Sequence, residues 1–251
     1  MFYKKWFDPS KNILISGDSH TYGHGHQEFP LDPYRNPPPL TTWPNYIWDS
    51  NKFNNVAHPG ISNGDITQSI YEHWNANIKV VAVMFTFPHR RDFSYQGYGY
   101  TFNPNRIISL SNNPLEDNIR QNIVKENKEL FKQFQKMYTM QQSDESNHIY
   151  LLKNIIAIQN LCNSNDCKFF WCTIKNFTVG EEKSKSPYIN WQIAQLEKLI
   201  DLRNYFSIDN KSMSEFSDGL GKHVLTSTGH YNKEAHKIWG QAFKQFINTN
   251  I

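Results

Sequence analysis

The stretch Lys11-Asn-Ile-Leu-Ile-Ser-Gly-Asp-Ser-His20 decides the fold of this 251-residue chain. Residues 12–16 are mostly apolar and partly β-branched, and they end at Gly17, which predicts a buried strand followed by a turn. The clearest second strand is Lys79-Val-Val-Ala-Val-Met-Phe85, which is apolar after its first residue. Such runs are typical of parallel strands that are buried on both faces. The sequence therefore favours a sheet covered by helices on each side.

Strand and helix patterns alternate along the rest of the chain. Further strands are expected at residues 53–57 and 168–173, with a weak one near 204–208. Helices are expected at 43–48, after an N-cap at Ser62, and at 115–140, 148–162, 191–200 and 232–247. Parallel neighbours require crossover connections, so this order predicts an α/β fold, a three-layer α/β/α sandwich with a mostly parallel sheet of about five strands. We expect one domain over residues 1–251, with long loops near 23–42 and 88–114.

Composition and charge narrow the class of protein. Hydrophobic residues make up 38% of the chain and charged residues 20%, which is ordinary for a compact domain. The net charge is only +3 and no dense basic run is present, so we expect no nucleic-acid partner. No stretch approaches the roughly 18 apolar residues of a spanning helix, and the start of the chain does not resemble a signal peptide. We therefore expect synthesis in the cytoplasm and no membrane association.

The three cysteines are evenly spaced, at Cys162, Cys167 and Cys172. This spacing matches neither a CxxC redox pair nor a zinc-binding pattern. We expect them to be reduced and to fill the core.

The segment Gly17-Asp-Ser-His-Thr-Tyr-Gly23 lies where the first strand ends, and ligands bind at the carboxyl ends of parallel strands. Ser19 is therefore a candidate nucleophile, the alternative being a simple turn. A serine hydroxyl needs a base to take its proton, and a loop just before the last helix offers His230. His223 is a weaker second choice for that base. Donors for an oxyanion are expected after the second strand, at Gly60 and Asn63.

Three motifs in this order resemble the SGNH (GDSL-type) hydrolase superfamily. They are Gly17-Asp18-Ser19, the segment from Ala57 through Pro59-Gly60 to Ser62-Asn63, and Gly229-His230 before the final helix. The fuller string GDSHTYGHG, followed by TTWPNYI and NVAHPGISN, is most similar to a divergent branch found in tailed phages and marine bacteria. The resemblance covers nearly the whole chain.

This resemblance implies a flavodoxin-like fold and hydrolysis of an ester without a cofactor. Ser19 would be the nucleophile and His230 the general base. The backbone N–H groups of Ser19 and Gly60 would contribute to the oxyanion hole, and Asp18 would hold the turn. The substrate would be a small-molecule or glycan ester, with an O-acyl or O-acetyl group on a carbohydrate favoured.

The chain departs from the family pattern in two places. The third block of the family has Gly-x-Asn-Asp, whereas this chain has Phe85-Thr-Phe-Pro-His-Arg90, so Thr86 and Arg90 are the substitute donors, with Asn63 beside them. The family acid two or three residues before the base is replaced by Ser227 and Thr228. Either Asp218 supplies the acid from the preceding loop, or Ser19 and His230 work as a dyad.

Other residues of the same rim have alternative interpretations. A divalent metal would need three of the imidazoles of His20, His24, His26, His58 and His89, but their spacing is not a ligand signature and we expect no metal. His236 is expected to be structural.

Two loop features could contact a substrate. Arg90 or Arg91 is either a solvated cation or a receptor for an anionic or sugar group. The rings of Tyr95-Gln-Gly-Tyr-Gly-Tyr100 either form a stacking platform or pack over the edge of the sheet.

Two functions of different classes therefore compete. The first is a serine esterase that forms an acyl-enzyme on Ser19. The second is a catalytically weakened SGNH domain that serves as a structural or glycan-binding part of a larger assembly, such as a phage particle. Assembly into a virion or a homo-oligomer is an expectation attached to that second function.

Overall fold

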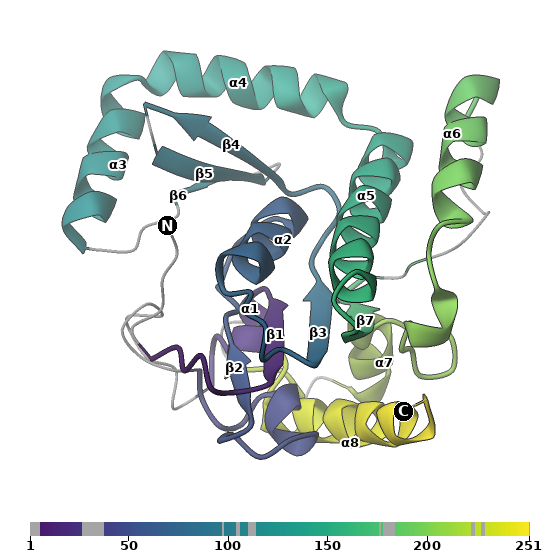
Figure 1. Cartoon of the computed structure of the whole chain (residues 1–251). Coiled ribbons are helices and arrows are strands. Elements are labelled where there is room, and N and C mark those ends of the chain that lie inside the picture. The colour runs from purple at the N-terminus through teal and green to yellow at the C-terminus, as the bar shows by residue number, and fades with distance from the viewer. Residues whose placement is uncertain are drawn as a thin grey trace.

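The computed structural model describes residues 6–26, 38–96, 98–103, 106–109, 114–175, 177, 184–221, 224–226 and 229–250 (Figure 1). Its strands are β1 (Ile13–Gly17), β2 (Phe53–Asn55), β3 (Val80–Phe85), β4 (Arg91–Tyr95), β5 (Tyr98–Asn103), β6 (Arg106–Ser109) and β7 (Lys168–Thr173). Its α-helices are α1 (Ser19–Tyr22), α2 (Asn63–Glu72), α3 (Pro114–Glu126), α4 (Lys128–Gln141), α5 (Asp144–Asn163), α6 (Pro187–Glu197), α7 (Met213–Leu220) and α8 (Lys233–Asn250). Two 3₁₀ helices are η1 (Trp43–Tyr46) and η2 (Leu202–Asn204).

The main sheet is parallel and has the strand order β2-β1-β3-β7. β1 lies between β2 and β3, so the turn after Gly17 opens at the carboxyl edge of the sheet, flanked by the loops after β2 and β3. The weak fifth strand expected near 204–208 forms a single parallel bridge, between Trp171 and Tyr205. The predicted α/β fold with a parallel sheet is confirmed.

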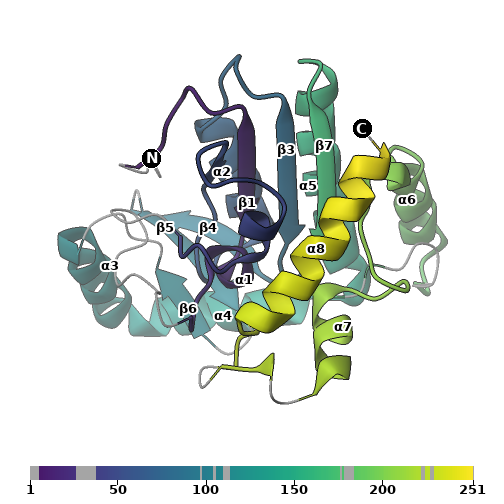
Figure 2. The same ribbon diagram turned by 90° about the horizontal axis from the view of Figure 1, so that it is seen from below.

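Helices cover both faces of this sheet, as Figures 1 and 2 show. On one face, strand side chains such as Leu14 and Val81 pack against α2, α5 and α6. On the other face, Ile15 and Met84 pack against α8, with Trp239 fully buried between the layers. Successive side chains of a strand point to opposite faces, which is why the apolar runs identified in the sequence supply two cores.

The prediction of a long loop at 88–114 is wrong for most of that segment. β4, β5 and β6 form a second, antiparallel sheet there, beside α3 and α4 (Figure 1). Its rings pack into a third core, in which Phe93 and Tyr100 contact Phe131 of α4. Aromatic residues favour strands. In this segment they are interrupted by Asn, Gly and Pro residues, which favour loops, so the sequence shows no clear strand pattern.

Several predicted helices begin or end elsewhere. The first strand is followed directly by the short α1, and the segment expected as a helix at 43–48 is the 3₁₀ helix η1. The helix expected at 115–140 is divided at Asn127 into α3 and α4. Residues 213–220 form α7 where a loop was expected. The loop predicted at 23–42 lies largely outside the described residues.

The N-cap predicted at Ser62 is confirmed. Its side chain accepts a hydrogen bond from the backbone N–H of Asp65, and the Asp65 carboxylate accepts one from the N–H of Ser62, which completes a capping box. Among the described residues, no helix combines the length and apolar character needed to cross a membrane.

Candidate active site

The nucleophile candidate lies in a turn that local sequence enforces. β1 ends at Gly17, where a Cβ atom would lie 2.1 Å from the hydroxyl oxygen of Thr21, so a side chain there would clash. Asp18 then caps α1 by accepting a hydrogen bond from the N–H of His20 at 3.0 Å. Ser19 is therefore the first residue of a helical turn that faces the carboxyl edge of the sheet, and its residue surface is 6% exposed.

His230 reaches this serine from the other end of the chain. Its Nε2 lies 3.1 Å from the hydroxyl oxygen of Ser19. The loop that carries it is held by a hydrogen bond from Thr226 N to the carbonyl oxygen of His230 and by a turn at Gly229, whose φ is +78°. A positive φ suits glycine, so the conformation of this turn explains why a glycine precedes His230. The structure thus brings the predicted nucleophile and base together.

Two further imidazoles surround the ring of His230. The ring centroid of His20 lies 5.0 Å away and that of His24 4.7 Å away. Burial lowers the pKa of His20, although the charge of Asp18 opposes this effect. His20 is therefore held neutral, so it places no positive charge beside the candidate base. The sequence analysis considered His20 and His24 only as possible metal ligands, expected no metal there, and missed their position around His230.

Two other histidines that were considered as possible metal ligands make protein contacts. His26 lies against His236 and donates from Nε2 to the carbonyl oxygen of Tyr231 at 3.1 Å. His58 donates from Nδ1 to the carbonyl oxygen of Pro59 at 2.9 Å. Within the part of the chain that the structure describes, no three His, Cys, Asp or Glu side chains are arranged to hold a metal ion. His236 is buried and accepts from the N–H of Trp43, as expected of a structural histidine.

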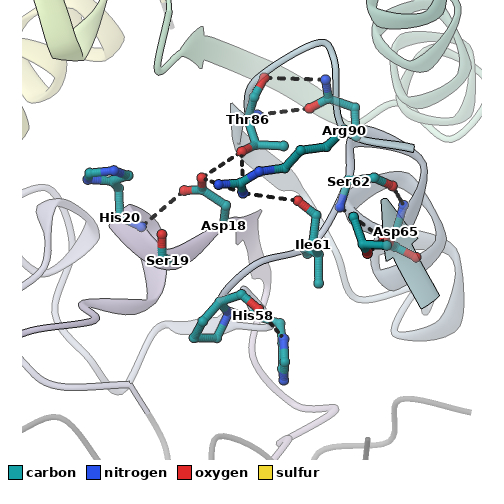
Figure 3. A network of polar contacts seen from close by, with 12 residues as sticks. Asp18, Ser19, His20, His58, Ile61, Ser62, Asp65, Thr86 and Arg90 are labelled. Carbon is teal, nitrogen blue, oxygen red and sulfur yellow. Dashed lines mark hydrogen bonds and ion pairs between the residues drawn. The ribbon is translucent and has the colours of Figure 1, made fainter. Parts of the chain in front are cut away.

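A buried ion pair lies directly behind the serine. Figure 3 shows Thr86 and Arg90 converging on the carboxylate of Asp18. The Thr86 hydroxyl donates to Asp18 at 2.6 Å, and Arg90 Nη1 lies 3.3 Å from the same oxygen. Burial raises the pKa of the Asp18 carboxyl, but the charge of Arg90 and the hydrogen bonds from Thr86 and from the backbone N–H of His20 outweigh it, so the pKa lies below its usual value. Asp18 is therefore ionised and fixes the turn at Ser19.

Thr86 does not offer the oxyanion donor predicted from the sequence. Its hydroxyl donates to Asp18, and its backbone N–H donates to Oδ1 of Asn63 at 2.8 Å. Asn63 in turn donates from Nδ2 to the carbonyl oxygen of Thr86 at 3.3 Å. This reciprocal pair joins the start of α2 to the end of β3. It explains why an asparagine follows the second strand without requiring a role toward substrate.

The other donor candidates differ in their surroundings. Arg90 Nη1 donates to Thr86 Oγ1 at 2.9 Å and to the carbonyl oxygen of Ile61 at 3.3 Å, in addition to Asp18. Gly60 has a φ of +82°, which requires glycine and leaves no Cβ at the turn after β2. Gly60 and the backbone N–H of Ser19 remain the predicted oxyanion donors.

The acid candidate contacts a neighbour of the base. Asp218 lies in α7 rather than in a loop, and its carboxylate accepts a hydrogen bond from the hydroxyl of Tyr231 at 2.8 Å. Tyr231 therefore takes the contact that the sequence assigned to His230. His223, Ser227 and Thr228 lie outside the described residues.

The loop features considered for substrate contact are largely structural. The guanidinium of Arg91 lies 3.9 Å from the ring centre of Tyr150 and donates to Asn147 Oδ1 at 2.8 Å. Tyr95 and Tyr100 pack against Phe131, which agrees with rings that cover a sheet rather than form an open platform.

Neither a protein-family model nor a curated protein matches the chain. Solved structures with a similar fold include a GDSL-like lipase from Bacteroides thetaiotaomicron, at 15% identity over 96% of this chain and 90% of that one, with a TM-score of 0.43. A phospholipase A1 from Streptomyces albidoflavus matches at 13% identity over 95% and 98% of the two chains, with a TM-score of 0.40. A carbohydrate esterase matches at 10% identity over 97% and 70%, with a TM-score of 0.48.

Proposed function

We propose that this protein is a serine hydrolase of the SGNH type that cleaves an O-acyl or O-acetyl ester. The observation that carries the proposal is the 3.1 Å separation between the Ser19 hydroxyl and His230 Nε2, across 211 positions of sequence. A base must lie within about 2.6–3.2 Å of the hydroxyl whose proton it takes, and this pair meets that condition. The ordered SGNH motifs of the sequence support the same assignment.

The chemistry would proceed in two halves. Ser19 Oγ attacks the ester carbonyl while its proton moves to His230 Nε2, and the backbone N–H groups of Ser19 and Gly60 stabilise the oxyanion. The alcohol leaves with that proton, and an acyl-enzyme remains on Ser19. Water then attacks the acyl carbon while its proton moves to His230 Nε2, and Ser19 Oγ leaves with that proton as the carboxylic acid is released.

Ser19 and His230 carry the proton transfer in this scheme. The carboxylate of Asp218 accepts a hydrogen bond from the hydroxyl of Tyr231, the residue that follows His230. The neutral His20 beside His230 keeps the local potential from opposing protonation of the base. We propose a carbohydrate as the acyl carrier, and a comparison of acetylated oligosaccharides with p-nitrophenyl acetate and butyrate tests this choice.

A second candidate is a weakened SGNH domain with a structural or glycan-binding role. The observation that favours it is that two of the side-chain donors expected at the oxyanion position are engaged within the protein, Asn63 Nδ2 by the carbonyl oxygen of Thr86 and the Thr86 hydroxyl by Asp18. Oxyanion donors account for a factor of about 10²–10³ each in turnover.

Hydrolysis of p-nitrophenyl acetate separates the two candidates. We expect Ser19→Ala and His230→Ala each to lower kcat by at least about 10³-fold, and the double variant to fall no further, because the two residues act as a unit. Ser10→Ala is the matched control, since Ser10 is an exposed serine that contacts Asp8. Equal rates for the wild type and Ser19→Ala would refute the enzyme and leave the binding domain.

A further inference from the structure

Two cysteines meet where α5 ends and β7 begins. The carbonyl oxygen of Cys162 accepts hydrogen bonds from the N–H of Asn165 at 3.1 Å and from the N–H of Cys167 at 3.0 Å. Asp166, between them, has a left-handed backbone with φ of +49°. This is the geometry of a Schellman-type helix end, in which the side chains at the two ends of the long hydrogen bond are in contact. Here both of those side chains are thiols.

The placement of this pair suits a disulfide. A disulfide requires Cα atoms about 4.4–6.8 Å apart, and the direct backbone bond between Cys162 and Cys167 holds the two residues adjacent. Both residues belong to the same core cluster on one face of the sheet. Cys172 belongs to the core on the opposite face of the sheet, so it is separated from the pair by the sheet itself.

Both cysteines are buried, and Cys167 is the one of the two that lines an opening. A polar cavity of about 540 Å³ is lined by Cys167 together with Asp166, Lys168 and Arg203, and Cys162 is not among its lining residues. The neighbouring Cys162 thiol, together with the charge of Lys79, lowers the pKa of Cys167, whereas the neighbouring Cys167 thiol and burial raise the pKa of Cys162. Cys167 is therefore the thiol that an external reagent reaches first.

We propose that Cys162 and Cys167 are a redox-active dithiol that an external small-molecule disulfide oxidises to an intramolecular disulfide. The Cys167 thiolate attacks one sulfur of the external disulfide, forms a mixed disulfide and releases the first thiol. The Cys162 thiolate then attacks the Cys167 sulfur and releases the second thiol. The two cysteines lose two electrons and two protons in total, and the reagent gains them as two thiols. The bond would join the last turn of α5 to the start of β7.

Peptide mapping of the native full-length chain tests the pair directly. The protein is incubated with glutathione disulfide, unfolded, alkylated with iodoacetamide and digested with trypsin. Cleavage after Lys153, Lys168 and Lys175 places both cysteines of the pair in one peptide, 154–168, and Cys172 in the next, 169–175. We expect peptide 154–168 to be two hydrogens lighter than the reduced peptide and unalkylated, while peptide 169–175 is alkylated. Two alkylated cysteines in peptide 154–168, or glutathione retained on it, would overturn the proposal.

Single variants assign the order of attack. Cys162→Ala removes the resolving thiol, so glutathione is expected to remain on Cys167. Cys167→Ala is expected to take up no glutathione at Cys162, and Cys172→Ala to form the disulfide as the wild type does. Glutathione on Cys162 in Cys167→Ala would reverse the assigned order. The mapping of the wild type stands by itself if a variant does not fold, and it is independent of any hydrolase activity.

Discussion

At the scale of single residues, the buried ion pair between Asp18 and Arg90 supports the turn that carries Ser19. Asp18 is fully buried and Arg90 nearly so. The loop after β3 places a guanidinium in contact with the residue that caps the turn of Ser19. The position of Ser19 therefore depends on a charge supplied by another loop.

We expect Arg90→Met to lower the free energy of unfolding by about 3–5 kcal/mol, because it leaves the Asp18 carboxylate buried without its cation. Urea unfolding measures the change. Arg203→Met is the matched control, since Arg203 pairs with Asp201 on the exposed surface at 2.8 Å, and we expect no measurable change there. Similar decreases in the free energy of unfolding in both variants would show that the buried pair with Asp18 contributes no more than an exposed ion pair.

At the scale of elements, α8 is held against η1 at a position without a side chain. A Cβ atom at Gly240 would lie 2.5 Å from the carbonyl oxygen of Trp43 and 2.9 Å from Cβ of Tyr46. α8 begins three residues after His230, so the close approach of this helix also fixes the loop that carries the base.

We expect Gly240→Ala to destabilise the protein by about 1–3 kcal/mol, because overpacking outweighs the gain of about 1 kcal/mol in helix propensity. Gly219→Ala in α7 is the control, since no atom lies within 4 Å of its Cβ position. That variant is expected to be neutral or slightly more stable. Thermal and urea unfolding of both variants compare them, and a stabilised Gly240→Ala would contradict the assigned contact.

The two capping boxes of α2 and α5 differ in what surrounds them. Ser62 is buried, caps α2 and also donates to Asp92 Oδ1 of β4 at 2.9 Å. Ser143 caps α5 at the surface, through a bond of 3.1 Å from the N–H of Ser146.

Ser62→Ala is therefore expected to cost about 2 kcal/mol of stability, against about 1 kcal/mol or less for Ser143→Ala. Urea unfolding of the two variants under one condition measures the difference. Equal costs would mean that the bond from Ser62 to β4 contributes nothing.

At the scale of the whole molecule, a pair of carboxylates joins the small antiparallel sheet to the parallel core. Asp65 of α2 accepts from the hydroxyl of Thr101 in β5 at 2.9 Å, and Asp92 of β4 accepts from Ser62 and from the Tyr150 hydroxyl. Burial, with the charge of Asp92, raises the pKa of Asp65 to about 6. The Asp65 carboxyl therefore binds its proton more tightly in the folded protein than in the unfolded chain.

The sign of the pH effect follows from that shift. Between the ordinary pKa of 3.8 and about 6, the folded state binds the proton of Asp65 more tightly, so its contribution to stability is full at low pH and is lost as the pH rises through this window. We expect Asp65→Asn to gain about 3 kcal/mol relative to the wild type between pH 4 and pH 7. Urea unfolding at several pH values measures this difference, and a difference that does not change with pH would rule out the assignment.

Much of the fold was predictable because its signals are local. The apolar runs at 12–16, 79–85 and 168–173 became β1, β3 and β7, and Ser62 began the predicted helix. The antiparallel sheet was missed because its aromatic residues lie among Asn, Gly and Pro, so no regular strand pattern stands out in the sequence. The helices α3 and α4, which follow it directly, pack against it. The break at Asn127 was missed because the apolar spacing continues across it.

The sequence by itself determined the alternation of strands and helices, the turn after β1, and the residue types suited to a nucleophile and a base. Those properties depend on side-chain periodicity, capping and glycine geometry within a few neighbouring positions. Only the tertiary structure decided that His230 meets Ser19, that Arg90 pairs with Asp18 and that Asp218 contacts Tyr231. The physical reason is that these contacts join segments brought together by strand order and helix packing, which no short pattern in the sequence encodes.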